Sequence, residues 1–144
     1  MVLKFKLNNK EDGAVITGGE NVRDTLVVPK KLQHKGEEYP VIAIEDNAFG
    51  ECKDLTSVII PNTVTKIGDY AFWACTGLTS IVIPDSVTEI GEYTFEGCKS
   101  LANINIPDSV TEIGCGAFCD CDSLPDDVEQ KIMDINGFAL NKLP

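Results

Sequence analysis

Apolar residues recur along this chain with a period of 23 residues, and three successive segments, residues 55–77, 78–100 and 101–123, align without a gap. Their apolar positions form fixed columns: Leu55, Leu78, Leu101 and Leu124; Val58, Ile81 and Ile104; Ile60, Ile83 and Ile106; Val64, Val87 and Val110; Ile67, Ile90 and Ile113; Phe72, Phe95 and Phe118. Residues 41–54 match the second half of this repeat and residues 26–29 the first half, so residues 30–39 are an insertion. Such a repeat predicts units that bury their apolar columns only by stacking on one another.

Each unit contains the signals of two short strands. The spacing Leu-x-x-Ile-x-Ile ends on the alternation of a strand, and the proline that follows ends that strand because it has no N–H to donate: Pro61, Pro84 and Pro107. The next stretch, residues 87–91 in the second unit, is short and β-branched, which predicts a second strand. Stacking would place the equivalent strands of successive units about 4.8 Å apart in a parallel sheet.

The rest of each unit predicts turns. Tyr-Thr-Phe-Glu-Gly-Cys has the spacing of one helical turn, with Gly97 placed to end it. A glycine column follows the second strand, and we interpret it as allowing the backbone to turn there: Gly68, Gly91 and Gly114.

The two ends of the chain depart from the repeat and predict caps. Near the N-terminus, Phe5–Leu7 and Ala14–Thr17 alternate around a turn-rich stretch, which predicts a hairpin. Near the C-terminus, Pro125 and acidic residues begin a segment that ends at Gly137 and whose apolar residues share one helical face: Val128, Ile132 and Ile135. We therefore expect one domain with a hairpin cap (1–25), a first repeat with the insertion (26–54), three regular repeats (55–123) and a helical cap (124–144).

Length and charge narrow the class of protein. The 144 residues suffice for one domain with one core. With 12 basic and 23 acidic side chains, the net charge is −11, which argues against nucleic acid or an anionic membrane as the partner. Residues 78–144 contain 3 of the basic and 12 of the acidic side chains, so nine of the eleven net charges lie in this part.

Neither a membrane span nor a leader is expected. No apolar run approaches the roughly 20 residues that a membrane-spanning helix needs. Residues 1–7 alternate like a strand and lack the apolar run and cleavage site of a signal peptide. Two explanations stay open: the protein remains in the cytoplasm, or a leader has been removed.

Four of the six cysteines, Cys52, Cys75, Cys98 and Cys121, recur at the 23-residue period, which predicts a buried ladder of thiols and no disulfides among them. Cys115 and Cys119 occupy columns that hold charged or aromatic residues in other units, so we expect both near the surface. Together with Cys121 they could bind a soft metal or form a strained bridge, but no fourth ligand follows at zinc-finger spacing. We expect no cofactor and no metal.

Residues suited to catalysis are few. His34 is the only histidine, and we expect it in a solvated loop of the charged insertion. The motifs of serine hydrolases, phosphate-binding loops and zinc proteases do not occur. The repeat stacks two pairs of carboxylates: Asp85 with Asp108, and Glu89 with Glu112. We expect them to form a solvated outer row, with calcium coordination as the alternative.

Two surfaces are candidates for binding a partner. The first is the outer face of the main strands, which we call the strand-lined face; small uncharged residues lie there between the inward ones: Ser57, Ile59, Ser80, Val82, Asn103 and Asn105. Repeat solenoids bind partners along such extended surfaces, although Ile59 and Val82 could simply be good strand formers. The second is the edge made by the helical turns, which we call the aromatic edge: Tyr70, Trp73 and Tyr93. Exposed Trp and Tyr are favoured interface anchors, although Trp73 could instead cover the neighbouring coil.

The 23-residue pattern Leu-Thr-Ser-Ile-x-Ile-Pro-Asp-Ser-Val-Thr-x-Ile-Gly-x-x-x-Phe-x-x-Cys resembles the BspA-like, or Treponema pallidum type, leucine-rich repeat over about residues 22–124. The first unit, with its insertion before Tyr39–Phe49, resembles the opening repeats of such proteins. The resemblance implies a right-handed leucine-rich repeat solenoid, mostly β with short helical turns, of about five coils. It also implies a bacterial protein-binding or adhesive module at the cell surface or secreted, although the chain shows neither leader nor anchor.

We therefore expect a non-enzymatic module that binds a protein, such as a host or extracellular matrix component. The alternative is a structural spacer or assembly unit without a ligand of its own. An enzyme that acts on glycans through paired acids is the least favoured class.

Overall fold

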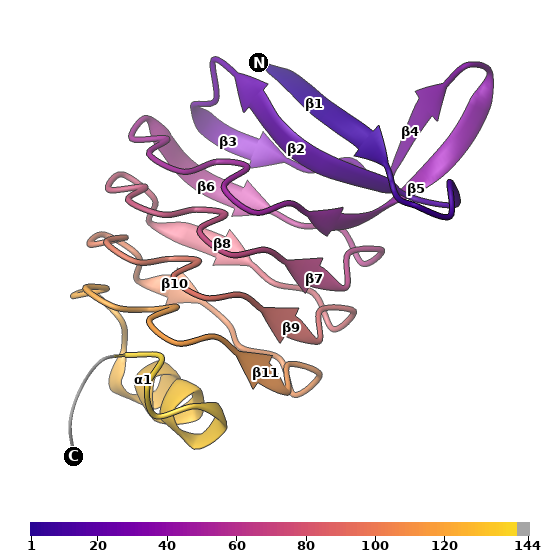
Figure 1. Cartoon of the computed structure of the whole chain (residues 1–144). Helices are drawn as coiled ribbons and strands as arrows, with labels where there is room; N and C mark the ends of the chain where they lie inside the picture. Colours follow the sequence, from indigo (N-terminus) through magenta and orange to yellow (C-terminus); the bar gives the residue numbers. More distant parts are fainter. Residues whose placement is uncertain (141–144) are drawn as a thin grey trace.

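The structure is a computed structural model of the chain, and it describes residues 1–140. The chain winds into a stack of coils that begins with a group of strands at the N-terminus and ends at helix α1, Asp126–Ile135 (Figure 1). Two sheets, one of four strands and one of seven, run along the stack and enclose the core. The expected repeat solenoid of the leucine-rich type, mostly β, is confirmed.

The four-stranded sheet contains the main strands of the repeats, all parallel: β3 (Asp24–Val27), β6 (Leu55–Ile59), β8 (Ser80–Val82) and β10 (Asn103–Ile104). The pairing register joins residues one period apart, such as Val58 with Ile81. Because side chains alternate between the two faces of a strand, this register puts each apolar column on the inner face of the sheet.

The seven-stranded sheet contains the second strand of each repeat together with the N-terminal strands: β1 (Val2–Leu7), β2 (Ala14–Glu20), β4 (Lys31–His34), β5 (Glu37–Ile44), β7 (Lys66–Ile67), β9 (Glu89–Ile90) and β11 (Glu112–Ile113). Strands β2, β5, β7, β9 and β11 are parallel neighbours, while β1 pairs antiparallel with β2. The N-terminal hairpin and the short second strands predicted from the sequence are thus confirmed.

The insertion is a β-hairpin and not a loop, so the sequence-based expectation for His34 was wrong. Strand β4 pairs antiparallel with β5 across a turn at Lys35 and Gly36, whose φ angles are 50° and 82°. His34 ends β4, is half-buried, and lies edge-on to the ring of Phe5 with 5.8 Å between the ring centroids. The hairpin therefore contacts the N-terminal strand instead of being a solvated loop.

The predicted cysteine ladder is confirmed at Cys75, Cys98 and Cys121, which are buried free thiols, whereas Cys52 is half-buried. Each buried thiol donates a hydrogen bond to a phenylalanine carbonyl oxygen of the coil before it, at Sγ–O distances of 3.1, 3.2 and 3.0 Å. Burial raises the pKa of Cys98 to about 12. Burial likewise raises the pKa of Cys121, and the hydrogen bond with Cys52 raises that of Cys75.

The glycine column has a different purpose from the one expected. Gly97 has a φ of 76°, as its predicted place at the end of a turn requires, but Gly68, Gly91 and Gly114 do not have positive φ angles. A Cβ on Gly91 would lie 2.6 Å from the backbone nitrogen of Asp69 in the preceding coil. The column therefore allows successive backbones to approach closely, because no side chain fits between them.

The C-terminal helix closes the stack as its pattern predicted. Ile132 is fully buried, and Val128 and Ile135 pack against the core. After the helix, the side chain of Asn136 donates to the carbonyl oxygen of Ile113 at 2.7 Å, so this segment occupies the free edge of β11. The division into caps and repeats remains our proposal, and residues 141–144 of the expected cap lie outside the described residues. Within residues 1–140, no helix has the length and apolar character needed to cross a membrane.

Candidate functional site

The strand-lined face carries two rows of outward side chains that run across the strands. The register pairs Val27 with Ile59 and Ile59 with Val82, and these side chains keep 59%, 44% and 51% of their surface exposed. The second row is polar and joins Thr25, Ser57, Ser80 and Asn103. The face therefore presents an uncharged apolar row beside an uncharged polar row.

The first repeat extends the strand-lined face beyond the residues that the sequence predicts for it. Thr25 and Val27 lie on β3, in register with the outward residues of β6. The match of residues 26–29 to the first half of the repeat already held this signal, because Val27 takes the position of Ile59.

The predicted residues of the strand-lined face differ in exposure and in hydrogen bonding. Ser57 and Ser80 are half-buried, whereas Asn103 and Asn105 are exposed. The Asn105 amide accepts a hydrogen bond from the N–H of Ile83 at 3.1 Å and donates one to the carbonyl oxygen of the same residue at 2.8 Å. Asn105 thus pairs with the end of β8, and its polar atoms are engaged within the fold.

A groove of about 430 Å³ lies at the C-terminal end of the strand-lined face, between β8, β10 and the start of α1. Four of the predicted binding residues line it: Ser80, Val82, Asn103 and Asn105. Helix α1 and the residue before it complete the wall with Pro125, Asp127 and Val128. Asp127 is the one charged side chain among the described lining residues, so the groove is apolar and amide-lined with a single carboxylate.

The aromatic edge is a packed stack of rings. Tyr70 and Tyr93 stack with 5.2 Å between ring centroids, and Tyr70 meets Trp73 edge-on at 6.3 Å. All three are half-buried, and the Trp73 ring packs over Gly50 of the preceding coil. Trp73 therefore covers a neighbouring coil, which was one of the two alternatives.

The two remaining cysteines have different environments. Cys115 is exposed, as expected, and its interaction with Tyr93 is the largest cause that raises the pKa of that phenol. Cys119 is buried, which corrects the expectation of a surface position. Trp73 and Glu96 fill the same column in earlier units and are half-buried. The shorter cysteine side chain does not reach as far from the backbone as theirs do.

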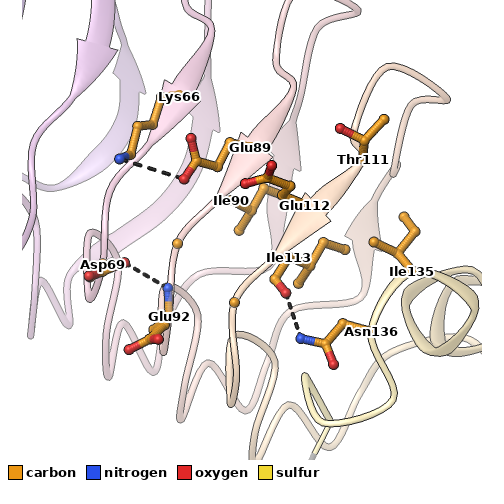
Figure 2. A pocket seen from close by; sticks show the side chains of 12 residues that line it. Lys66, Asp69, Glu89, Ile90, Glu92, Thr111, Glu112, Ile113, Ile135 and Asn136 are labelled. Atoms are coloured by element: carbon orange, nitrogen blue, oxygen red, sulfur yellow. Dashed lines mark hydrogen bonds and ion pairs between the residues drawn. The ribbon is translucent and has the colours of Figure 1, made fainter.

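A second groove, of about 530 Å³, follows the outside of the seven-stranded sheet over β7, β9 and β11 and ends beside Asn136 (Figure 2). Its charged lining consists of one lysine and four carboxylates: Lys66, Asp69, Glu89, Glu92 and Glu112. Lys66 Nζ lies 3.6 Å from a carboxylate oxygen of Glu89, so one of the four carboxylates is paired. The sequence predicts Glu89 and Glu112 only as members of a solvated outer row of carboxylates.

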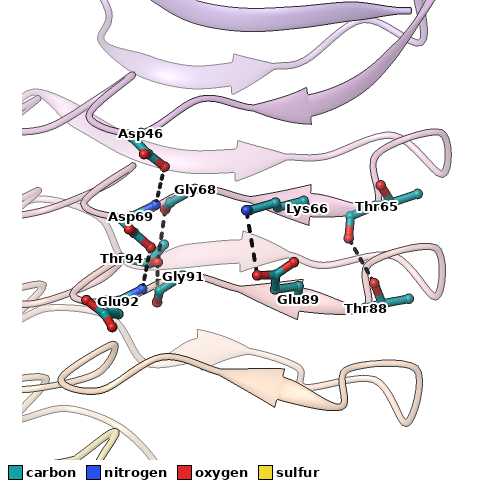
Figure 3. A network of polar contacts seen from close by, with 10 residues as sticks. All are labelled: Asp46, Thr65, Lys66, Gly68, Asp69, Thr88, Glu89, Gly91, Glu92 and Thr94. Carbon is teal, nitrogen blue, oxygen red and sulfur yellow. Dashed lines mark hydrogen bonds and ion pairs between the residues drawn. The ribbon is translucent and has the colours of Figure 1, made fainter. Parts of the chain in front are cut away.

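Other polar groups on this side connect the coils (Figure 3). Asp46 accepts a hydrogen bond from the backbone N–H of Asp69, and Asp69 accepts one from that of Glu92, both at 2.8 Å. Thr94 is buried and donates to the carbonyl oxygens of Gly91 and Gly68. Asp46 and Asp69 therefore join successive coils through their carboxylates.

The candidate metal ligands do not gather into a group of three in the part of the chain that the structure describes. Within residues 1–140, no three His, Cys, Asp or Glu side chains form a group that could hold a metal ion. Asp108 accepts a hydrogen bond of 2.8 Å from Lys131, which lowers the pKa of Asp108. Glu89 faces Lys66, so one carboxylate of each stacked pair has a lysine partner.

Comparison with protein families decides the classification. A family model described as the BspA type leucine rich repeat region matches residues 40–142 with six copies. The chain belongs to the BspA-type leucine-rich repeat family. This confirms the resemblance found in the 23-residue pattern.

Solved structures support the assignment to the BspA-type family. A leucine rich cell surface protein from Faecalibacterium prausnitzii is 39% identical with a TM-score of 0.78, and the match covers 88% of this chain and 36% of that one. A leucine-rich repeat protein from Bacteroides ovatus is 30% identical with a TM-score of 0.74, covering 86% and 39%. One from Bacteroides capillosus is 27% identical with the same TM-score, covering 85% and 91%. A comparison with curated proteins gave no match.

This BspA-type chain therefore spans 36% and 39% of the length of the first two structures. Membership of the family establishes a general leucine-rich repeat protein, and such repeats suggest interaction with other proteins.

Proposed function

We propose that this chain is a non-enzymatic protein-binding module, of the adhesive type, that takes its partner on the strand-lined face. The observation that carries the proposal is the row of Val27, Ile59 and Val82, three β-branched side chains exposed by 44–59% and held in register across three strands. A host protein or an extracellular matrix component is the expected class of partner.

Physical chemistry supports this use of the face. Apolar surface removed from water contributes about 25 cal/mol per Å² to association. The β-branched side chains are stiff at χ1 and stand on paired strands, so ordering them on binding costs little entropy. The neighbouring row of Ser57, Ser80 and Asn103 offers hydrogen bonds without the desolvation cost of charges.

The test compares proteins captured from host tissue extracts by the wild-type chain and by charge variants. Val82→Asp and Ile59→Asp should lose a defined set of captured proteins while keeping the wild-type melting temperature, because both side chains point to solvent. Thr76→Asp is the matched control, since Thr76 is exposed on a turn away from the sheet. Retention of that set by both face variants, with its loss in Tyr70→Ala or Tyr93→Ala, would move the site to the aromatic edge.

The alternative is a spacer or assembly unit, and the continuous hydrogen bonding between coils favours it. The hydroxyls of Thr79 and Thr88 each donate to a threonine carbonyl oxygen one coil earlier, at 3.1 and 3.4 Å, as part of a stiff rod-like stack. Light scattering separates the two functions. End-to-end association that grows with concentration favours an assembly unit, whereas a strict monomer that binds a partner favours the module.

A further inference from the structure

The groove at the C-terminal end of the strand-lined face suggests what the partner carries. Val82, the last member of the exposed apolar row, lines this groove of about 430 Å³ together with the start of α1. Next in the row is Asn105, whose amide is engaged with Ile83. An apolar segment that follows the row therefore arrives, beyond Val82, at a groove whose one charged side chain is the carboxylate of Asp127.

The electrostatics of this pocket favour a cation. Asp127 is exposed in the first turn of α1 and is the one charged residue among the described lining residues. Asp126 and Glu129 belong to the same turn. The positive end of a helix dipole is equivalent to about half a charge, so the carboxylates of Asp126 and Asp127 alone leave this turn net negative.

The wider charge distribution acts in the same direction. Residues 78–144 contain 12 acidic and 3 basic side chains, a balance of −9, whereas residues 1–77 contribute −2. A field of one sign at one end of the stack attracts and orients a partner of the opposite sign before contact. A cationic side chain thus meets the more favourable potential at the α1 end of the face.

We infer that the partner presents an apolar stretch followed by a lysine or arginine: the apolar side chains lie on Val27, Ile59 and Val82, and the cation enters the groove beside Asp127. This inference rests on the proposed function and adds the chemistry of the bound segment and the end of the stack at which its cation lies. The cation fixes the register of the segment, which a row of similar apolar side chains would leave free to slide.

The test selects short random peptides displayed on phage against four proteins: the wild-type chain, Asp127→Lys, Asp134→Lys and Val82→Asp. The wild-type pool should be enriched in peptides that combine apolar residues with Lys or Arg. The Asp127→Lys pool should keep the apolar residues and exchange the basic ones for Asp or Glu. Asp134→Lys makes the same charge change on an exposed part of α1 outside the groove and should select the wild-type pool.

Peptides taken from the wild-type pool should bind Asp127→Lys about tenfold more weakly, a change of about 1.4 kcal/mol. The difference should shrink at high salt, because exposed charges are screened. Equal basic content in the wild-type and Asp127→Lys pools would overturn the inference and leave the proposed function standing. Selection of the wild-type pool by Val82→Asp would overturn both, and a wild-type chain that enriches no peptide would overturn the inference.

Discussion

The ring of Phe72 lies on the ring of Phe95 with the centroids 5.6 Å apart and the two planes inclined by 2°. Phe49 stacks on Phe72, and Phe95 on Phe118, with centroid distances of 5.5 and 5.2 Å. A column of buried rings therefore runs through the core along the whole stack, one ring for each coil.

Replacing Phe95 with Ala should lower the free energy of unfolding by about 3–5 kcal/mol, because it leaves a cavity between two rings that the fixed coils cannot close. Tyr70 also stacks on a ring of the next coil but is half-buried, so Tyr70→Ala should cost less than half as much. Urea unfolding followed by circular dichroism measures both. Equal losses would show that ring stacking, and not burial, determines the cost.

A methyl group on Gly91 should destabilise the stack although the φ angle of this glycine is not positive. The new Cβ would lie 2.6 Å from the backbone nitrogen of Asp69, and overpacking of this kind costs about 1–3 kcal/mol. Gly137→Ala is the control, because nothing lies within 4 Å of its added Cβ. Thermal unfolding should separate the two variants clearly, and similar melting temperatures would contradict the close-approach explanation.

The buried thiols make the protein sensitive to alkaline pH. The pKa of Cys98 is raised by burial from an ordinary 9.0 to about 12, so between these values the unfolded chain releases a proton that the folded chain retains. The contribution of this thiol to the free energy of unfolding is therefore fully present below pH 9. Between pH 9 and about pH 12 the free energy of unfolding falls by up to about 1.4 kcal/mol per pH unit because of this thiol. Cys98→Ala should reduce the slope of unfolding free energy against pH, whereas Thr76→Ala, at an exposed position without a titratable group, should leave it unchanged; urea unfolding at a series of pH values measures both.

The amide of Asn105 should contribute to stability more than to binding. Asn105→Ala removes two hydrogen bonds to Ile83 and should cost about 1–3 kcal/mol of unfolding free energy. Asn103→Ala on the same strand-lined face is the control, since that side chain is exposed and shares the polar row. Denaturation curves that coincide for the two variants would show that the Asn105 amide does not hold the end of β8.

The repeat made the coils predictable, because identical columns fix which side of each strand faces inward. The positions of Val58 and Ile81, and of the buried thiols, follow directly from the 23-residue period. The same reasoning placed Ile59 and Val82 on the outer face, where the structure exposes both.

The predictions for His34 and for the glycine column were wrong because the repeat pattern does not determine these features. The insertion has no second copy to compare, and its hairpin depends on Lys35 and Gly36, whose positive φ angles suit a two-residue turn. A Lys-Gly pair between alternating residues was the signal for this hairpin. The role of Gly91 depends on the distance to a neighbouring coil, which a pattern along one chain does not contain.

The groove beside α1 could not be predicted from the sequence for a related reason. Asp127 lies 45 residues after Val82 in the chain, and the two line one groove because α1 folds back beside β8 and β10. The groove therefore depends on how the helix packs against the last coils, and the repeat does not specify this.

In residues 55–123 each coil is hydrogen-bonded to the coil before it, and the bonds recur between the same positions: the N–H of Thr79 donates to the carbonyl oxygen of Thr56, and that of Thr88 to Thr65, both at 2.9 Å. The contacts between one pair of coils therefore match those between the next pair, and one coil can take the place of another. Loss of residues 78–100 would leave Gly77 followed by Leu101, in place of Gly77 followed by Leu78. Unequal recombination between repeats of the gene can thus remove or add one whole coil at a time. Each such event changes the length of the solenoid by about 4.8 Å, the spacing between neighbouring strands.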